Sequence, residues 1–168
     1  MSKPVTTVKK GATTRNRAKT PPRGETGVVG RYLAVAKTRG RGVGVPTPQL
    51  IEQVRTGLAY SELEVLQASL GSPMERLAAQ VGISRATLQR RKRTNSALSA
   101  IQSDRVVRLA RLMGKAMDVL ETETKARQWL NSPQYGLGGA TPLDYAYTEV
   151  GAREVENLLG RIEHGVFS

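Results

Sequence analysis

The spacing of apolar residues from Pro48 onward follows the three-to-four-residue period of amphipathic helices. Separate apolar faces precede Gly57 and Gly71, and a longer one runs from Ser99 to about Leu120. No stretch alternates with a period of two between hairpin turns, which is the pattern of a β-strand. The sequence therefore predicts an all-α protein.

Hydroxyl side chains before these faces predict helix starts, because their oxygens accept hydrogen bonds from first-turn amides. Ser72 and Glu75 have the spacing of a capping box, with Pro73 at the first helical position. The other expected caps are Ser61, Ser84, Ser99, Thr141 and either Thr122 or Thr124.

Two helices are expected after the Gly-rich loop at residues 134–139. Leu143, Tyr147 and Val150 form the apolar side of the first, which we expect to end at Gly151. The last helix ends at Gly165, which tolerates a left-handed conformation. Its apolar face is formed by Val155, Leu158, Leu159 and Ile162.

Residues 1–48 contain one apolar patch, residues 32–36, among Pro, Gly, Thr and basic residues. This composition buries too little apolar surface to offset the entropy of ordering, so we expect a largely disordered basic arm. Its RGRG run, residues 39–42, resembles flexible nucleic-acid-binding segments. A solubilising tail, a wrongly assigned start and an organelle-targeting peptide are the alternatives to phosphate binding.

Charge is distributed unevenly along the chain. Residues 1–49 hold eleven basic residues and one acidic residue, whereas residues 128–168 hold two basic and five acidic residues. A net charge of +12 with this asymmetry predicts a polyanionic partner at one end and a different partner at the other.

The sequence offers little for catalysis, metal binding or membrane insertion. With no cysteine and one histidine, it cannot form disulfides or a His/Cys zinc site, and we expect no cofactor. Carboxylate pairs such as Glu154 and Glu156 are two residues apart and face different sides of a helix, so we do not expect an enzyme. No apolar run reaches membrane-spanning length and no signal segment is visible, so we expect a soluble cytoplasmic protein.

Residues 72–93 resemble the helix-turn-helix of Xre-like repressors. Ala78 is small where the second helix crosses, Gly82 tolerates a left-handed turn, and Leu88 returns the second helix to the core. Met74 stands where many such motifs carry a glutamine that contacts the DNA backbone, and Arg76 is a possible substitute. The alternative is an ordinary helical hairpin with a solvated basic face.

The second helix of this motif has an outward face suited to DNA. Arg85 can pair with guanine and Gln89 with adenine in the major groove. The cations that follow, including Lys92, are expected to contact phosphate. The predicted DNA-binding residues are Ser84, Arg85, Thr87, Gln89, Arg90, Arg91 and Arg93.

Motifs near the C-terminal end are dense and specific. They comprise Trp129-Leu130, Pro133, Leu137-Gly138-Gly139, Thr141-Pro142-Leu143-Asp144, Thr148-Glu149, Gly151-Ala152 and residues 161–167, RIEHGVF. With these motifs, residues 57–167 resemble Xre/MbcA/ParS-type antitoxins, the partners of RES-domain toxins. The resemblance implies a homodimer that binds operator DNA, represses its own operon and occludes an NAD⁺-degrading toxin with its C-terminal domain, within a higher-order toxin-antitoxin complex.

The resemblance and the residue types together suggest where the toxin binds. Val166 and Phe167 follow a helix stop and gain little unless a partner covers them. His164 either caps the helix end or bonds across an interface. The predicted toxin-binding residues are Gly139, Thr141, Asp144, Glu149, Arg161, His164, Gly165, Val166 and Phe167.

Three regions are expected: the arm at 1–48, the helix-turn-helix domain at 49–98, and a connector helix with the toxin-binding domain at 99–168. The leading function is a type II antitoxin and autorepressor. The alternative is a dimeric DNA-binding transcriptional regulator without a toxin partner.

Overall fold

The computed structural model describes residues 27–37 and 46–165, and these residues form helices without any strand. Predictions for residues 1–26, 38–45 and 166–168, including Val166 and Phe167, lie outside the described residues. The elements are α1 (Val28–Lys37), α2 (Thr47–Thr56), α3 (Tyr60–Leu70), α4 (Met74–Gln80), α5 (Arg85–Thr94), α6 (Ala100–Leu120), α7 (Glu123–Asn131), the 3₁₀ turn η1 (Tyr135–Leu137), α8 (Pro142–Tyr145) and α9 (Glu149–Glu163).

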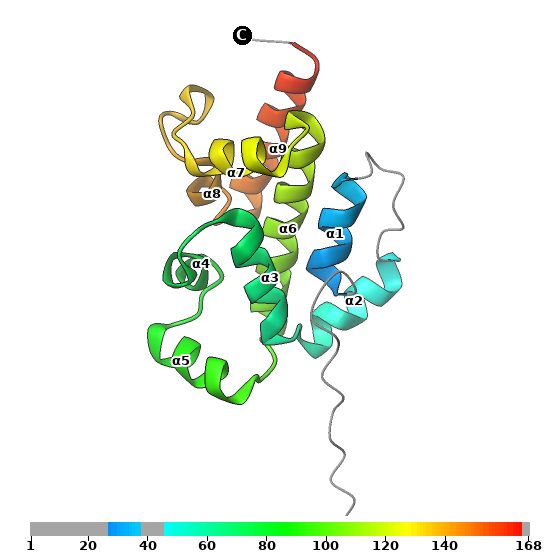
Figure 1. Ribbon diagram of the computed structural model, residues 1–168, viewed down its shortest axis with the longest axis vertical. Helices are drawn as coiled ribbons and strands as arrows, with labels where there is room; N and C mark the ends of the chain where they lie inside the picture. The colour runs from blue at the N-terminus through cyan, green and yellow to red at the C-terminus, as the bar shows by residue number, and fades with distance from the viewer. Residues whose placement is uncertain (1–26, 38–45, 166–168) are drawn as a thin grey trace, which may run out of the picture.

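The long helix α6 is the centre of the fold, with α1, α2, α3, α7 and α9 packed against it (Figure 1). Its predicted start and end are confirmed, and Ser99 and Gln102 form a complete capping box. Met113 and Leu112 are almost fully buried. Burial of each such side chain stabilises the fold by about 1.5–3 kcal/mol.

Helix α1 lies within the arm that the composition predicted to be disordered. For residues 28–37 that expectation is wrong, because Val28, Val29 and Leu33 are buried in the shared core. The carboxylate of Glu62 on α3 accepts hydrogen bonds from the amides of Val28 and Val29 at 3.1 and 2.9 Å. The cap is 33 residues away in sequence, so a search for local caps could not find it.

Helices α4 and α5 form the predicted helix-turn-helix. Ala78 and Leu88 are buried, and the Ala78 carbonyl accepts a 2.8 Å hydrogen bond from the Ile83 amide across the turn. Gly82 has the expected left-handed backbone, with φ of 76°. The motif is therefore held by the spacing of small and apolar residues seen in the sequence.

The predicted caps divide into two groups. Ser84, Ser99, Thr122 and Thr141 cap helices as expected. Ser61 and Ser72 do not: α3 starts at Tyr60, and α4 starts one residue later than predicted, so Glu75 is not at the capping-box position. The Ser72 carbonyl accepts from the Gln67 side chain, and the Ser72 hydroxyl is buried without a partner.

The prediction of one helix from Thr141 to Gly151 is also wrong. Helix α8 ends at Tyr145, Tyr147 and Val150 are exposed, and Thr148 caps the start of α9. Gly151 lies in the first turn of α9, where a Cβ atom would collide with the carbonyl of Tyr145. Its role is a close approach between α8 and α9 rather than a helix stop.

The face of the last helix is as predicted. Val155 and Leu159 are fully buried, and Leu158 and Ile162 are partly buried. Gly165 has φ of 66°, and its amide donates to the Ile162 carbonyl, as expected of a helix end. Helix α9 is thereby fixed along α6, and its end is directed away from α5 (Figure 1).

Candidate functional site

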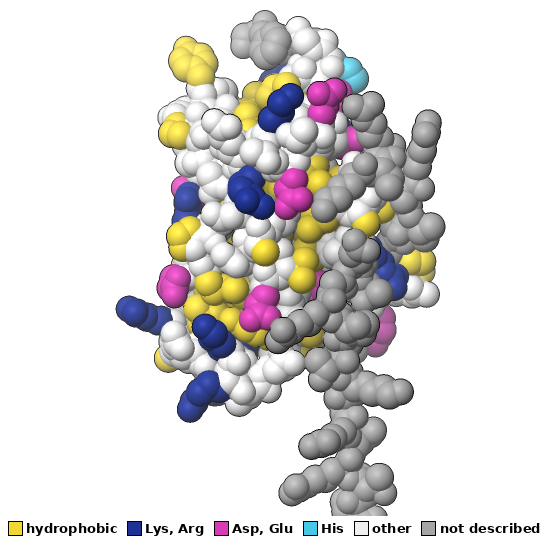
Figure 2. Space-filling model, viewed as in Figure 1, with side chains coloured by type: hydrophobic (Ala, Val, Ile, Leu, Met, Phe, Trp, Pro, Cys, Tyr) yellow, Lys and Arg dark blue, Asp and Glu magenta, His cyan; other side chains and the backbone are white. Residues whose placement is uncertain are grey.

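The outward side of α5 carries the residues proposed for DNA reading. Arg85 and Gln89 are exposed, and so are Arg90, Lys92 and Arg93. Figure 2 shows Lys and Arg side chains projecting from the lower left of the molecule, where Figure 1 places α5. The arrangement gives a cationic face that a phosphate backbone can approach.

Ser84 and Thr87 stand at the start of this helix. The Ser84 hydroxyl accepts a 3.3 Å hydrogen bond from the Thr87 amide and donates to the Thr87 hydroxyl at 3.0 Å. Both residues lie beside the exposed face, but their hydroxyl groups already stabilise the helix start. Their first role in this structure is to fix the orientation of α5.

Arg91 does not share the exposed face of its neighbours. It follows Leu88 by three residues, which places both on the same side of α5, and only 9% of it is exposed. Its Nη1 atom is buried without a hydrogen-bond partner. Burial lowers the pKa of Arg91, and the charge of Arg90 lowers it further. The predicted phosphate contact of Arg91 is therefore not supported by its position.

Arg76 on α4 binds within the protein. It donates to the Asp144 carboxylate at 2.8 Å and to the Thr141 hydroxyl at 3.3 Å. Gln80, one turn further along α4, donates to the Leu143 carbonyl and to Asp144, both at 3.1 Å. These bonds join the first helix of the helix-turn-helix to the start of α8.

Asp144 is the centre of that link. Burial alone would raise its pKa, but hydrogen bonds from Arg76, Thr141 and Gln80 lower the pKa below its usual range. Thr141 also caps α8 through the Asp144 amide at 3.2 Å. Both residues were predicted to bind the toxin, and both have internal structural roles.

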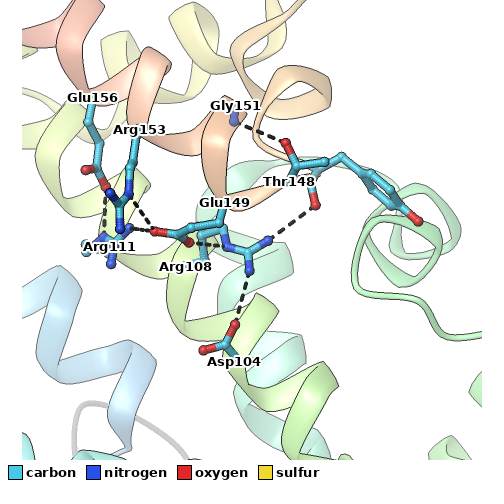
Figure 3. Close-up of polar contacts among 9 residues, drawn as sticks. Asp104, Arg108, Arg111, Thr148, Glu149, Gly151, Arg153 and Glu156 are labelled. Carbon is cyan, nitrogen blue, oxygen red and sulfur yellow. Dashed lines mark hydrogen bonds and ion pairs between the residues drawn. The ribbon is translucent and has the colours of Figure 1, made fainter.

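Glu149 is the second predicted toxin-binding carboxylate with internal partners (Figure 3). It pairs with Arg108 at 2.8 Å, Arg111 at 3.5 Å and Arg153 at 3.4 Å. Burial alone would raise the pKa of Glu149, but these cations lower it. The network holds the start of α9 against α6, and sequence reasoning missed Arg108 and Arg111 because their partners are about 40 residues away.

The other predicted toxin-binding residues lie in two places. Gly139 is exposed in the loop before α8, with φ of 85°. Arg161 makes a long ion pair with Glu154 at 3.7 Å, and His164 and Gly165 are exposed at the end of α9. The structure therefore does not gather the predicted set into one compact site.

One exposed residue in the C-terminal region was not among the predicted toxin-binding residues. Tyr135, at the start of η1, is fully exposed. A tyrosine beside a Gly-rich turn was visible in the sequence, but its exposure was not. Within residues 27–37 and 46–165, no cluster of His, Asp and Glu could hold a metal ion, and no helix is long and apolar enough to cross a membrane.

Comparisons with known proteins match two successive parts of the chain. Residues 49–111 match the Xre-like helix-turn-helix domain of antitoxins, and residues 115–165 match the C-terminal toxin-binding domain of Xre/MbcA/ParS antitoxins. The two matches meet within α6, so the central helix belongs partly to each domain.

Relatives matched over more than two thirds of the chain agree with these domains. The chain is 32% identical to an Antitoxin Xre of Yersinia enterocolitica over 79% of this chain and 93% of that protein. It is 34% identical to an Antitoxin Xre of Photorhabdus laumondii over 76% of this chain and 89% of that protein. A Prs ADP-ribosylating antitoxin of Sphingobium is 28% identical over 68% of this chain and 78% of that protein. With its helix-turn-helix and its toxin-binding domain, the chain belongs to the Xre/MbcA/ParS family of antitoxins.

Proposed function

We propose that this antitoxin neutralises a RES-domain toxin that degrades NAD⁺, by covering the entrance to the active site of the toxin. The match of residues 115–165 to a toxin-binding domain carries the proposal. The Sphingobium relative is named for ADP-ribosylation, a reaction class that consumes NAD⁺, and this favours a toxin with NAD-linked chemistry.

The end of α9 is the part best placed to enter the toxin. His164 and Gly165 are exposed, whereas Val155 and Leu159, about one to three turns earlier, are fixed in the core. Residues 166–168 continue from this end with the apolar pair Val166 and Phe167. Because α9 is already fixed in the core, ordering this helix adds no entropic cost on binding.

Electrostatic attraction supports the same interface at longer range. The segment 128–168 has a net charge of −3, from two basic and five acidic residues, and a pocket for an anionic dinucleotide is basic. Asp144 and all four acids of α9 are paired with cations of this chain, so the attraction depends on partly exposed ion pairs rather than on free carboxylates. Contacts from Thr141, Asp144 and Glu149 to the toxin are secondary in this proposal.

The test of neutralisation is co-expression with the product of the adjacent gene. The full chain should restore growth and co-purify with that product at a fixed ratio. A chain lacking residues 164–168 should lose neutralisation while its circular dichroism and melting temperature stay unchanged, because α9 keeps its buried face. Full neutralisation by this shortened chain would contradict the proposed entry of the C-terminal end. If the full chain neither rescues growth nor co-purifies, it is a transcriptional regulator without that toxin.

We further propose that a homodimer binds operator DNA through α5 and represses the operon. Arg85 and Gln89 would contact base edges, and Arg90, Lys92 and Arg93 would contact phosphate. Two α5 helices are needed because one short recognition helix reads only a few base pairs, and a dimer places two of them on half-sites one helical turn apart. Sedimentation of the chain with an operator duplex measures the number of copies bound.

A further inference from the structure

The loop between α7 and α8, residues 134–140, is closed by its own backbone. The Gln134 amide donates to the Ala140 carbonyl, and the Gly139 amide donates back to the Gln134 carbonyl, both at 3.0 Å. The Gln134 side chain also donates to the carbonyls of Trp129 and Ser132. Leu137 is buried and fixes the loop to the core. The loop is thus a rigid projection.

Tyr135 is the most exposed large hydrophobic residue in the described part of the chain, at 101% of its reference area. Figure 2 shows a hydrophobic side chain projecting at the upper left, where Figure 1 draws this loop. Next to it, Gly138 and Gly139 have positive φ, and a Cβ at either would meet no atom within 4 Å. The aromatic ring therefore stands beside bare backbone that a partner can approach closely.

The same loop packs on α9. A Cβ at Gly136 would lie 3.1 Å from the side chain of Leu158, which is about one and a half turns before the end of that helix. The loop between α7 and α8 and the end of α9 lie at the same end of the molecule, away from α5 (Figure 1). Both also lie within the residues matched by the toxin-binding domain.

We propose that Tyr135 is a second anchor for the toxin. Its ring enters an apolar pocket on the toxin that also offers a hydrogen-bonding group to the phenol, beside the opening that the end of α9 covers. A rigid tyrosine supplies a large contact area at low entropic cost, and such residues often dominate binding energies. This inference rests on the proposed neutralisation of a toxin by the C-terminal domain.

The local charge argues against nucleic acid as the occupant. Residues 132–143, SPQYGLGGATPL, contain no charged side chain, whereas binding to DNA is dominated by cations on phosphate. The continuity of the loop with α9 favours the toxin over a second antitoxin. A second copy is therefore the alternative that the experiment has to exclude.

The experiment measures binding of the full antitoxin to the product of the adjacent gene, with wild type, Tyr135→Ala and Tyr135→Phe compared. Tyr135→Ala should raise the dissociation constant about tenfold or more, the effect of a binding hot spot. Tyr135→Phe should recover most of the affinity because it keeps the ring. Melting temperature and affinity for an operator duplex should be the same for all three proteins, because the side chain is fully exposed in the described part of the chain.

The outcomes separate the two proposals. If wild type and Tyr135→Ala bind the toxin equally well, the proposal that Tyr135 is a second anchor is wrong, and the proposal of neutralisation is unaffected. If wild type does not bind the toxin, the proposed neutralisation is wrong, and so is the proposed contact of Tyr135 with the toxin. If Tyr135→Ala changes the sedimentation of the antitoxin alone, the ring contacts a second copy and the assignment to the toxin is wrong.

Discussion

The guanidinium of Arg76 lies 2.8 Å from the carboxylate of Asp144, and this ion pair joins the helix-turn-helix to the toxin-binding domain. The pair crosses 68 residues of sequence. From the sequence, Arg76 was a possible contact for DNA phosphate and Asp144 was a predicted contact for the toxin. Each side chain therefore contributes to holding the two domains together.

Replacement of Asp144 by Asn should lower the free energy of unfolding by about 0.5–1 kcal/mol at neutral pH, because both partners are partly exposed and screened by solvent. The pKa of Asp144 is lowered in the folded protein. Its contribution is therefore complete above the unfolded pKa of about 3.9 and is lost as the pH falls through the lower folded value. Urea denaturation from pH 7 to pH 2 measures this: the difference between wild type and Asp144→Asn should shrink at acidic pH, and a constant difference would contradict the role of the charge.

Replacement of Glu62 by Ala should loosen α1 without unfolding the protein. The change removes two hydrogen bonds to the amides of Val28 and Val29, a loss comparable to that of an N-cap, about 0.5–2 kcal/mol. Hydrogen exchange of the α1 amides should become faster, while exchange in the centre of α6 changes less. Glu64→Ala, an exposed acid on the same helix, is the matched control. Equal exchange in both variants would mean that Glu62 does not hold α1.

Replacement of Gly151 by Ala should destabilise the fold by about 1–3 kcal/mol, because the added methyl group forces the Tyr145 carbonyl away. Gly160 on the same helix is the matched control, since a Cβ there meets no atom within 4 Å. Gly160→Ala should instead stabilise by about 0.5–1 kcal/mol through helix propensity. Thermal unfolding of both variants measures the contrast, and equal shifts in melting temperature would contradict the close approach of α8 and α9.

Three arginines on α5 should respond differently to substitution. Arg85→Ala should reduce discrimination between operator and unrelated DNA by about 1–3 kcal/mol. Arg93→Ala should weaken binding to all sequences and reduce the salt dependence by about one unit of slope. Arg91→Met should leave the salt slope unchanged because that guanidinium is buried. Titration of duplexes at several salt concentrations measures the three effects, and a lower slope for Arg91→Met would place its charge at the DNA.

The sequence predicted the parts of the fold that depend on local chemistry. The spacing of Ala78, Gly82 and Leu88 and the cap at Ser99 depend on residues close together in the sequence, and the structure confirms them. The prediction of a capping box at Ser72 is wrong although the spacing fits one. The Ser72 carbonyl accepts a hydrogen bond from the Gln67 side chain, and α4 starts one residue later than predicted. A short motif cannot reveal such competition.

Long-range partners explain the remaining differences. The order of α1 depends on Glu62, and the internal use of Glu149 depends on Arg108 and Arg111, all far away in sequence. Arg91 is buried although its neighbours in the sequence are exposed cations, because it lies on the same side of α5 as the buried Leu88, three residues earlier. This relation was visible in the sequence. The contacts of α5 with DNA and of α9 with the toxin stay predictions, because they depend on surfaces outside this chain.

The central position of α6 has a consequence for the two proposed activities, toxin inhibition and repression. Buried residues from α3, α4, α7 and α9 belong to one continuous core around this helix, so the described parts of both domains should unfold together. A protease that captures the unfolded chain would thereby remove the proposed toxin inhibitor and the proposed repressor in one event. Release of the toxin and renewed transcription of the operon would then begin at the same moment, and fresh antitoxin would be made when the old supply is lost.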